Sequence, residues 1–268
     1  MTLPRPLTEL VDSVQIDGIL CDIDDTLTWK GRLIPEALMG LQRAQKAGLH
    51  VIPVTGRPAG WVDQIARLWP VDGVVGENGG LWFWMTEDGL RQGYSQSAVD
   101  RQRNQERLKK LQSTILSAVP GCAVASDQAY RELDLAIDFC EDVPPLDRTA
   151  VDEIVRLFQE SGATCKVSSI HVNGWYGEFD KLAGFKRLHQ ALWGTTPNPN
   201  KWAYFGDSAN DGPMFAHFPL SIGVANVREF LDRLETPPKW ITEGYGGHGF
   251  VEGLDRLLTL NADKKRIR

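Results

Sequence analysis

An apolar run that ends in a cluster of aspartates constrains this chain more than any other feature. Residues 19–28 read ILCDIDDTLT, so that Asp22, Asp24 and Asp25 follow directly on a strand-like segment. Two carboxylates about 4 Å apart repel each other by about 4 kcal/mol at an effective dielectric constant of about 20. The fold must therefore supply a compensating positive charge at the end of this strand.

A second pair of acids follows another apolar segment far along the chain. Asp207 and Asp211 lie in YFGDSANDGPMF, where a strand-like run gives way to a helix-like one. Ligands of open parallel sheets bind outside the carboxyl ends of the strands, so the two acid clusters would face one crevice. A hard cation relieves the repulsion there, and Mg²⁺ suits such oxygen ligands.

Helix capping is the alternative explanation for these acids. Aspartate is favoured at helix N-termini, which accounts well for Asp211 and tolerably for Asp207. Capping does not account for Asp22 and Asp24, because aspartate is disfavoured within strands. We therefore predict a shared magnesium site rather than caps alone.

The first eighty residues alternate short apolar runs with amphipathic segments, which predicts a parallel sheet with crossover helices. Strand-like segments lie at 17–24, 49–56 and 72–80, and helix-like segments lie at 35–48 and 59–69. The same texture returns after residue 180. There we expect helices at 181–194, 211–218, 227–234 and 249–260, and strands at 202–208, 220–225 and 239–242.

The middle of the chain has a different texture. A hairpin-like stretch at 81–93 precedes a long polar helix at about 98–118 and a compact set of strand-like and helix-like segments. We therefore predict a split core, residues 1–83 and 181–268, that carries an inserted α/β domain at 84–180.

Charge and hydropathy argue against several classes of protein. The net charge of −6 disfavours a nucleic-acid coat, which needs clustered Lys and Arg. The one basic stretch, residues 101–110, fits a solvated helix face. No apolar run approaches the roughly 20 residues of a membrane span, and the N-terminus lacks the apolar core of a secretion signal. We expect a cytoplasmic monomer or homodimer that binds neither nucleic acid nor membrane.

Two smaller signals lie between the acid clusters. Thr55 and Gly56 end the second strand, where a hydroxyl and a backbone N–H can bind phosphate oxygens. The same pair is also ordinary turn chemistry. Lys181 opens a helix, where its charge opposes the helix dipole. A role facing phosphate explains that position, although a lone lysine is more often solvated.

The order of these motifs resembles the haloacid dehalogenase-like superfamily of phosphohydrolases. Residues 22–26 match its first motif, Thr55 the second, Lys181 the third and residues 206–211 the fourth. The resemblance covers nearly the whole chain, and the insertion looks like the type IIB cap of sugar-phosphate phosphatases and phosphomannomutases. It implies a doubly wound, Rossmann-like α/β core with an inserted α/β cap domain. One departure is Asp25, where glycine is the commoner residue.

The resemblance also implies roles for the motif residues. Asp22 would be the nucleophile that forms an aspartyl-phosphate, and Asp24 would be the general acid and base. Mg²⁺ would be held by Asp22, the backbone carbonyl of Asp24 and Asp207. Asp211 would bind the ion through water or support its other ligands. The transferring phosphate would be bound by Thr55, Gly56, Lys181 and Asn210.

The insertion would then act as a lid that selects a small-molecule substrate. Candidate substrate contacts from the insertion and the loops that face it are Arg57, Asn78, His171, Asn173 and Trp175. Aromatic faces and amides suit a sugar. On the other hand, aromatic residues on strands are more often packing residues, and a histidine without an evident partner is more often structural.

The resemblance therefore implies a Mg²⁺-dependent phosphatase for a small phosphorylated metabolite, such as a sugar phosphate or a phosphorylated glycosyl compound. A phosphomutase of the same fold, similar to phosphomannomutase, would keep every core residue. A non-catalytic regulatory protein is a further alternative, and the complete motif set speaks against it. A nucleotide-binding α/β protein ranks last, because neither G-x-G-x-x-G nor G-x-x-x-x-G-K-[ST] follows the first strand.

Overall fold

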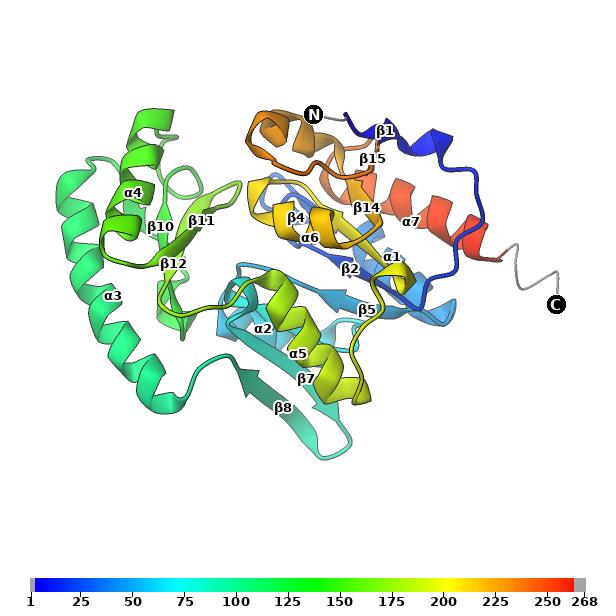
Figure 1. Cartoon of the computed structure of the whole chain (residues 1–268), viewed down its shortest axis with the longest axis horizontal. Coiled ribbons are helices and arrows are strands. Elements are labelled where there is room, and N and C mark those ends of the chain that lie inside the picture. Colours follow the sequence, from blue (N-terminus) through cyan, green and yellow to red (C-terminus); the bar gives the residue numbers. More distant parts are fainter. Residues whose placement is uncertain (1–2, 263–268) are drawn as a thin grey trace.

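A parallel sheet of six strands forms the centre of the computed structural model, which describes residues 3–262 (Figure 1). Every strand pairing within it is parallel. Strands from the last third of the chain lie beside strands from the first, so one sheet joins both halves of the core. Its order is β1 (Arg5–Pro6), β15 (Trp240–Ile241), β14 (Leu220–Gly223), β13 (Trp202–Gly206), β2 (Gly18–Cys21) and β5 (His50–Pro53).

Helices cover both faces of this sheet because successive strand residues point in opposite directions. Ile19 and Cys21 of β2 join a buried cluster with the first, second and last helices, whereas Leu20 joins a cluster with the other two. This confirms the doubly wound α/β core. The helices are α1 (Pro35–Lys46), α2 (Ala59–Leu68), α5 (Lys181–Trp193), α6 (Gly212–His217) and α7 (Gly246–Ala262).

A hairpin extends the sheet beyond β5. β6 (Val74–Gly76) lies beside the end of β5, where the Thr55 N–H donates to the Val75 carbonyl at 2.9 Å. β7 (Leu81–Thr86) and β8 (Gly89–Tyr94) follow as an antiparallel pair. The predicted hairpin is therefore present.

This hairpin packs against α2 and α5, which belong to the core. The predicted boundary at residue 84 falls inside β7. We propose instead that the core extends to Tyr94 and that the insert begins with α3 (Ala98–Ala118).

The insert has its own sheet and its own apolar cluster (Figure 1, green). Leu135, Ile137 and Val172 point toward two helices, α3 and α4 (Arg148–Glu160). The residues that alternate with them along these strands point the other way, toward the core. The four antiparallel strands lie in the order β11 (Thr164–Val167), β12 (His171–Trp175), β10 (Asp134–Asp138) and β9 (Ala123–Val124).

Side-chain caps explain where the two helices of the insert begin. The Ser97 hydroxyl accepts the Asp100 N–H at 3.1 Å, and the Asp147 carboxylate accepts the Ala150 N–H at 2.9 Å. Such caps satisfy N–H groups that have no partner within the helix.

No helix within residues 3–262 is both long enough and apolar enough to cross a bilayer.

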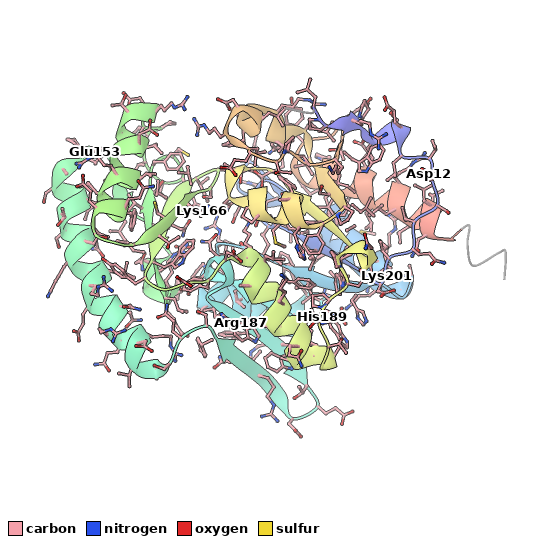
Figure 2. All side chains as sticks on the ribbon, viewed as in Figure 1. Asp12, Glu153, Lys166, Arg187, His189 and Lys201 are labelled. Atoms are coloured by element: carbon pink, nitrogen blue, oxygen red, sulfur yellow. The ribbon has the colours of Figure 1, made fainter. Side chains whose placement is uncertain are left out.

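The insert lies over the carboxyl ends of the core strands. Its edge strand β11 contacts a short 3-10 helix, η5 (Ala209–Asp211), that follows β13. Figure 2 shows Lys166 of β11 on the side of the insert nearer the core and Glu153 of α4 on the outer side. The acids that follow β2 and β13 are therefore enclosed between the two parts.

Some details of the elements could not be predicted. The helix expected at 227–234 is a 3-10 helix, η6 (Ala225–Arg233). Apolar residues three to four positions apart do not distinguish these two helix types. The last helix begins at Gly246, three residues before the predicted start. Strands of two residues were also missed, among them the hairpin β3 (Thr28–Trp29) and β4 (Arg32–Leu33), because they are too short to show alternation.

Candidate active site

Backbone pairing brings the two acid clusters to one edge of the sheet. Cys21 of β2 lies opposite Phe205 of β13, and the Asp22 N–H donates to the Phe205 carbonyl at 2.9 Å. Asp207 follows two residues after Phe205. Thr55 follows β5, which pairs with the other side of β2. Three adjacent strands therefore deliver predicted site residues to the same place.

Three buried carboxylates lie together at this edge, those of Asp22, Asp207 and Asp211. One oxygen from each lies within 4.8 Å of the others. Lys181 is their buried counter-charge, with Nζ 3.0 Å from Asp22 and 2.7 Å from Asp211. Because a buried charge is costly unless it is paired, three carboxylates around one lysine leave negative charge for a further cation to neutralise.

Asp211 and Asp207 use their oxygens differently. Asp211 accepts two backbone N–H groups at 2.9 and 3.2 Å with one oxygen, and it accepts Lys181 and the Tyr204 hydroxyl with the other. Asp207 accepts the Thr26 hydroxyl at 3.1 Å with Oδ1, whereas its buried Oδ2 has no partner within residues 3–262. This orphaned oxygen fits the ligand set of Mg²⁺.

Burial shifts the protonation of these groups. It raises the pKa of Asp22 to about 7, even though Lys181 opposes the shift. It also raises the pKa of Asp207 well above its usual range, and the charge of Asp211 adds to that effect. Burial by itself lowers the pKa of Lys181, but Asp211 and Asp22 outweigh it and raise that pKa. A cation bound among the acids would favour ionised carboxylates and so reverse their shifts.

Asp24 is bound by Arg57 rather than by the buried acids. Arg57 Nε lies 3.1 and 3.0 Å from the two Asp24 oxygens, and Nη2 lies 2.9 Å from one of them. The same guanidinium reaches the insert, with Nη1 3.2 Å from Asp127 and Nη2 2.7 Å from Glu141. Arg57 therefore links the predicted general acid to the insert.

A narrow cavity of about 10 Å³ lies between Asp22 and the insert. A space of this size holds at most about one water molecule. The predicted phosphate ligands Thr55 and Lys181 are buried and are not among the residues that line it. The predicted site residues that line it are Asp22, Asp24, Gly56, Arg57, His171, Asn173 and Asn210.

Asn78 and Trp175 are not among the residues that line this cavity. Trp175 stacks on Phe179 with 5.1 Å between the ring centroids and belongs to the main apolar cluster. Asn78 is buried with a φ of 53°, and a Cβ on Gly56 would approach its side chain within 3.2 Å. The Trp175 ring is therefore packed in the core, while the buried Nδ2 of Asn78 and Nε1 of Trp175 have no hydrogen-bond partner within residues 3–262.

His171 and Asn173 point into the cavity from the face of the insert's sheet that looks toward the core. His171 Nε2 lies 2.9 Å from Glu141 Oε2, an ion-pair distance without hydrogen-bond geometry. Asn173 donates to Asp134 at 3.0 Å. The alternation of β12 therefore explains why these two residues reach the site and Val172 does not.

Sequence analysis missed the charged residues that join the insert to the core. Arg131 donates to the Gly56 carbonyl at 2.8 Å and to Asp134 at 3.0 Å, with its side chain fully buried. Asp127 and Glu141 were missed as well. Their partner Arg57 is 70 and 84 positions away, so no local pattern in the sequence marks them.

Comparison with known proteins agrees with this arrangement. A family profile described as haloacid dehalogenase-like hydrolase matches residues 19–128. The chain is 25% identical over 252 residues to a phosphoglycolate phosphatase of Methanosarcina mazei, a match that covers 91% of this chain and 97% of that protein.

Solved structures share the fold at lower identity. A Thermoplasma acidophilum protein superposes with a TM-score of 0.71 at 20% identity, covering 92% of this chain and 99% of its own. The sucrose-phosphatase of Synechocystis, solved with sucrose and phosphate, gives 0.63 at 16% identity, with 91% and 98% covered. The profile match and the phosphatase relative make this chain similar to the haloacid dehalogenase-like hydrolases, and the solved structures share its fold.

Proposed function

We propose that the protein is a Mg²⁺-dependent phosphatase that hydrolyses a small phosphorylated metabolite, such as a sugar phosphate or a phosphorylated glycosyl compound. The observation that carries this proposal is the buried cluster of three carboxylates around Lys181, in which one oxygen of Asp207 has no partner within residues 3–262. The relative named for phosphoglycolate supports small phosphorylated substrates.

The residues that would hold Mg²⁺ are Asp22, Asp207 and the backbone carbonyl of Asp24. When bound, the ion supplies positive charge that favours an ionised Asp22 and neutralises the phosphoryl oxygens. Asp211 supports this arrangement indirectly, because it accepts four hydrogen bonds, from Lys181, the Tyr204 hydroxyl and the backbone N–H groups of residues 207 and 208.

The carboxylate of Asp22 attacks phosphorus, and the bond to the leaving oxygen breaks as the aspartyl-phosphate forms. Asp24 donates a proton to that leaving oxygen. It then takes a proton from the water that attacks the same phosphorus, which releases inorganic phosphate and restores Asp22.

The phosphoryl oxygens would be bound by groups that the fold already positions. Lys181 contacts Asp22 and Asp211, which leaves one of its three ammonium hydrogens to donate to a phosphoryl oxygen. Asn210 lines the cavity and accepts the Ser208 hydroxyl at 2.9 Å with its carbonyl oxygen, which leaves its amide nitrogen to donate elsewhere. Thr55 and Gly56 complete the set. Positioned donors of this kind supply most of the catalysis of phosphoryl transfer.

A panel of phosphorylated metabolites, read by release of inorganic phosphate with and without Mg²⁺, tests this function. We expect Mg²⁺-dependent release, and we expect Asp22→Asn to abolish it almost completely. Incubation with a hexose phosphate separates hydrolysis from phosphomutase activity, because a mutase yields an isomer rather than free phosphate. Full activity of Asp22→Asn would refute the assigned nucleophile.

A further inference from the structure

The turn after β5, residues 55–57, is held by both parts of the chain. The carbonyls of its first and last residues each accept a backbone N–H of a short 3-10 helix in the core, η2 (Glu77–Gly79), at 3.0 Å. The carbonyl between them, that of Gly56, accepts the guanidinium of Arg131 at 2.8 Å from Nη1. Arg131 belongs to the insert, so the insert completes the hydrogen bonding of a turn of the core.

The other contacts of Arg131 hold its guanidinium in one orientation. Nε lies 3.0 Å from Asp127, and Nη1 lies 3.0 Å from Asp134. Arg57 Nη1 binds the other oxygen of Asp127 at 3.2 Å. Asn173 donates to Asp134 at 3.0 Å. Because the side chain of Arg131 is fully buried and its planar guanidinium is engaged along more than one edge, it cannot turn away from the core turn while the insert is docked.

The core holds the same part of the insert from the other direction. The buried carboxylate of Glu77 accepts the backbone N–H groups of residues 132–134, which follow Arg131 directly. It also accepts the Ala59 N–H at the start of α2, at 3.0 Å. A carboxylate of the core therefore binds insert backbone beside the guanidinium with which the insert binds core backbone. This exchange keeps Arg131 next to Gly56.

The contact with Gly56 also fixes the direction of a neighbouring N–H. In a planar trans peptide, the carbonyl of one residue and the N–H of the next point in opposite directions. The N–H opposite the Gly56 carbonyl is that of Arg57, and it donates to Thr55 Oγ1 at 3.0 Å. Because this oxygen already accepts a hydrogen bond, the hydroxyl hydrogen is left to donate. Glycine does not restrict its own backbone, so this peptide would turn more easily without the guanidinium.

We propose that Arg131 is a positioning residue for phosphate binding, and that it acts through the peptide between Gly56 and Arg57 to orient the Thr55 hydroxyl toward a phosphoryl oxygen. The proposal rests on the phosphatase function proposed above, in which Thr55 binds that oxygen. It gives the insert a part in binding the phosphoryl group itself. Full affinity for phosphate then requires the insert to be docked on the core.

Binding of inorganic phosphate to the full chain with Mg²⁺ present tests the proposal without turnover. Arg131→Met combined with Asp134→Asn removes the guanidinium together with one of its acids, so that no additional buried charge is left unpaired. We expect Kd for phosphate, measured by titration calorimetry, to rise at least about tenfold, because a hydrogen bond to a charged group accounts for that factor or more. Asp134→Asn alone keeps the Gly56 contact and should leave Kd within about twofold of the wild type.

A second background separates positioning from a merely structural role. Thr55→Val removes the hydroxyl through which Arg131 is proposed to act. In that background, the same replacement of Arg131 should raise Kd for phosphate by less than about twofold. A tenfold rise in both backgrounds would mean that the site is loosened generally, and it would overturn the proposal. An unchanged Kd in the wild-type background would overturn it as well.

Arg131→Lys keeps a cation beside the two acids but loses the planar fork. It replaces the double variant if that protein does not fold, with the same expected rise and the same comparison in the Thr55→Val background. Arg156→Met is the matched control, because this arginine of the insert is half exposed on α4, and its Kd should equal that of the wild type.

The wild type distinguishes failure of this proposal from failure of the function on which it rests. If the wild type with Mg²⁺ neither binds inorganic phosphate nor hydrolyses p-nitrophenyl phosphate, the phosphatase function itself fails. If it does both, and the Arg131 variants bind phosphate as tightly as the wild type, only the positioning role fails.

Discussion

The acid cluster at the strand ends and the contacts between core and insert are both networks of charged side chains, but they are built differently. Asp22 and Asp207 follow neighbouring strands and are placed by backbone pairing. Arg57 and Glu141 meet across two parts of the chain, and Glu141 keeps 27% of its side chain exposed. The comparison indicates that backbone pairing places the acid cluster, whereas only side-chain contacts place the charges beside it.

The largest effect should come from removing the buried counter-charge. Lys181→Met leaves Asp22 and Asp211 without their ion pair, which should lower the free energy of unfolding by about 3–5 kcal/mol without Mg²⁺. Urea denaturation measures this loss. Arg187→Met, an exposed change on the same helix (Figure 2), is the control. A Lys181 variant as stable as that control would show that the acid cluster is not held as described.

The next effect concerns the orphaned oxygen of Asp207. Wild-type protein should be stabilised by Mg²⁺, by about 2.7 kcal/mol at one hundred times the dissociation constant. Asp207→Asn should lose this stabilisation while the metal-free protein stays about as stable as before, because the amide oxygen can still accept the Thr26 hydroxyl. Thermal unfolding with and without Mg²⁺ measures both. The exposed control Asp12→Asn should keep the Mg²⁺ shift, and a shift retained by Asp207→Asn would place the ion elsewhere.

A smaller effect is expected where the core holds the insert through Glu77. Its buried carboxylate accepts three successive backbone N–H groups of the insert, from Glu132, Leu133 and Asp134, at 2.9, 2.6 and 3.1 Å. Glu77→Gln turns an amide nitrogen toward these donors and should cost about 1–3 kcal/mol. Hydrogen exchange at residues 132–134 should accelerate. Exchange unchanged from wild type would mean that the insert does not depend on this carboxylate.

The smallest effect should appear in the pH dependence of stability at the partly exposed side of the interface. Burial raises the pKa of Glu141, but His171 and Arg57 outweigh it and lower that pKa to about 2. A folded pKa below the ordinary value of about 4.5 stabilises the protein above pH 4.5. This contribution is lost as pH falls toward 2.

The stability difference between wild type and Glu141→Gln measures that contribution. It should amount to about 1 kcal/mol at pH 6, because solvent screens the ion pairs, and it should shrink toward pH 3. Chemical denaturation at the two pH values gives both differences. A difference that grows as the pH falls would contradict the sign of the shift.

Helices and strands of both the core and the insert were predictable where their signals are local. Ile19, Leu20 and Cys21 form an unbroken apolar run because helices bury both faces of this strand. The helix at 98–118 has a serine before its first turn that caps it. The 3-10 character of residues 225–233 was not predictable, since it depends on hydrogen-bond spacing rather than on the pattern of apolar residues.

The sequence alone determined the acids at the strand ends, because carboxylates there need a ligand and parallel pairing gathers them at one edge. Only the tertiary structure decided that Arg57 joins Asp24 to Glu141 and that Trp175 packs against Phe179. Ion pairs and stacked rings form between residues far apart in the chain. Their partners depend on how the insert docks on the core, and no local residue pattern encodes that arrangement.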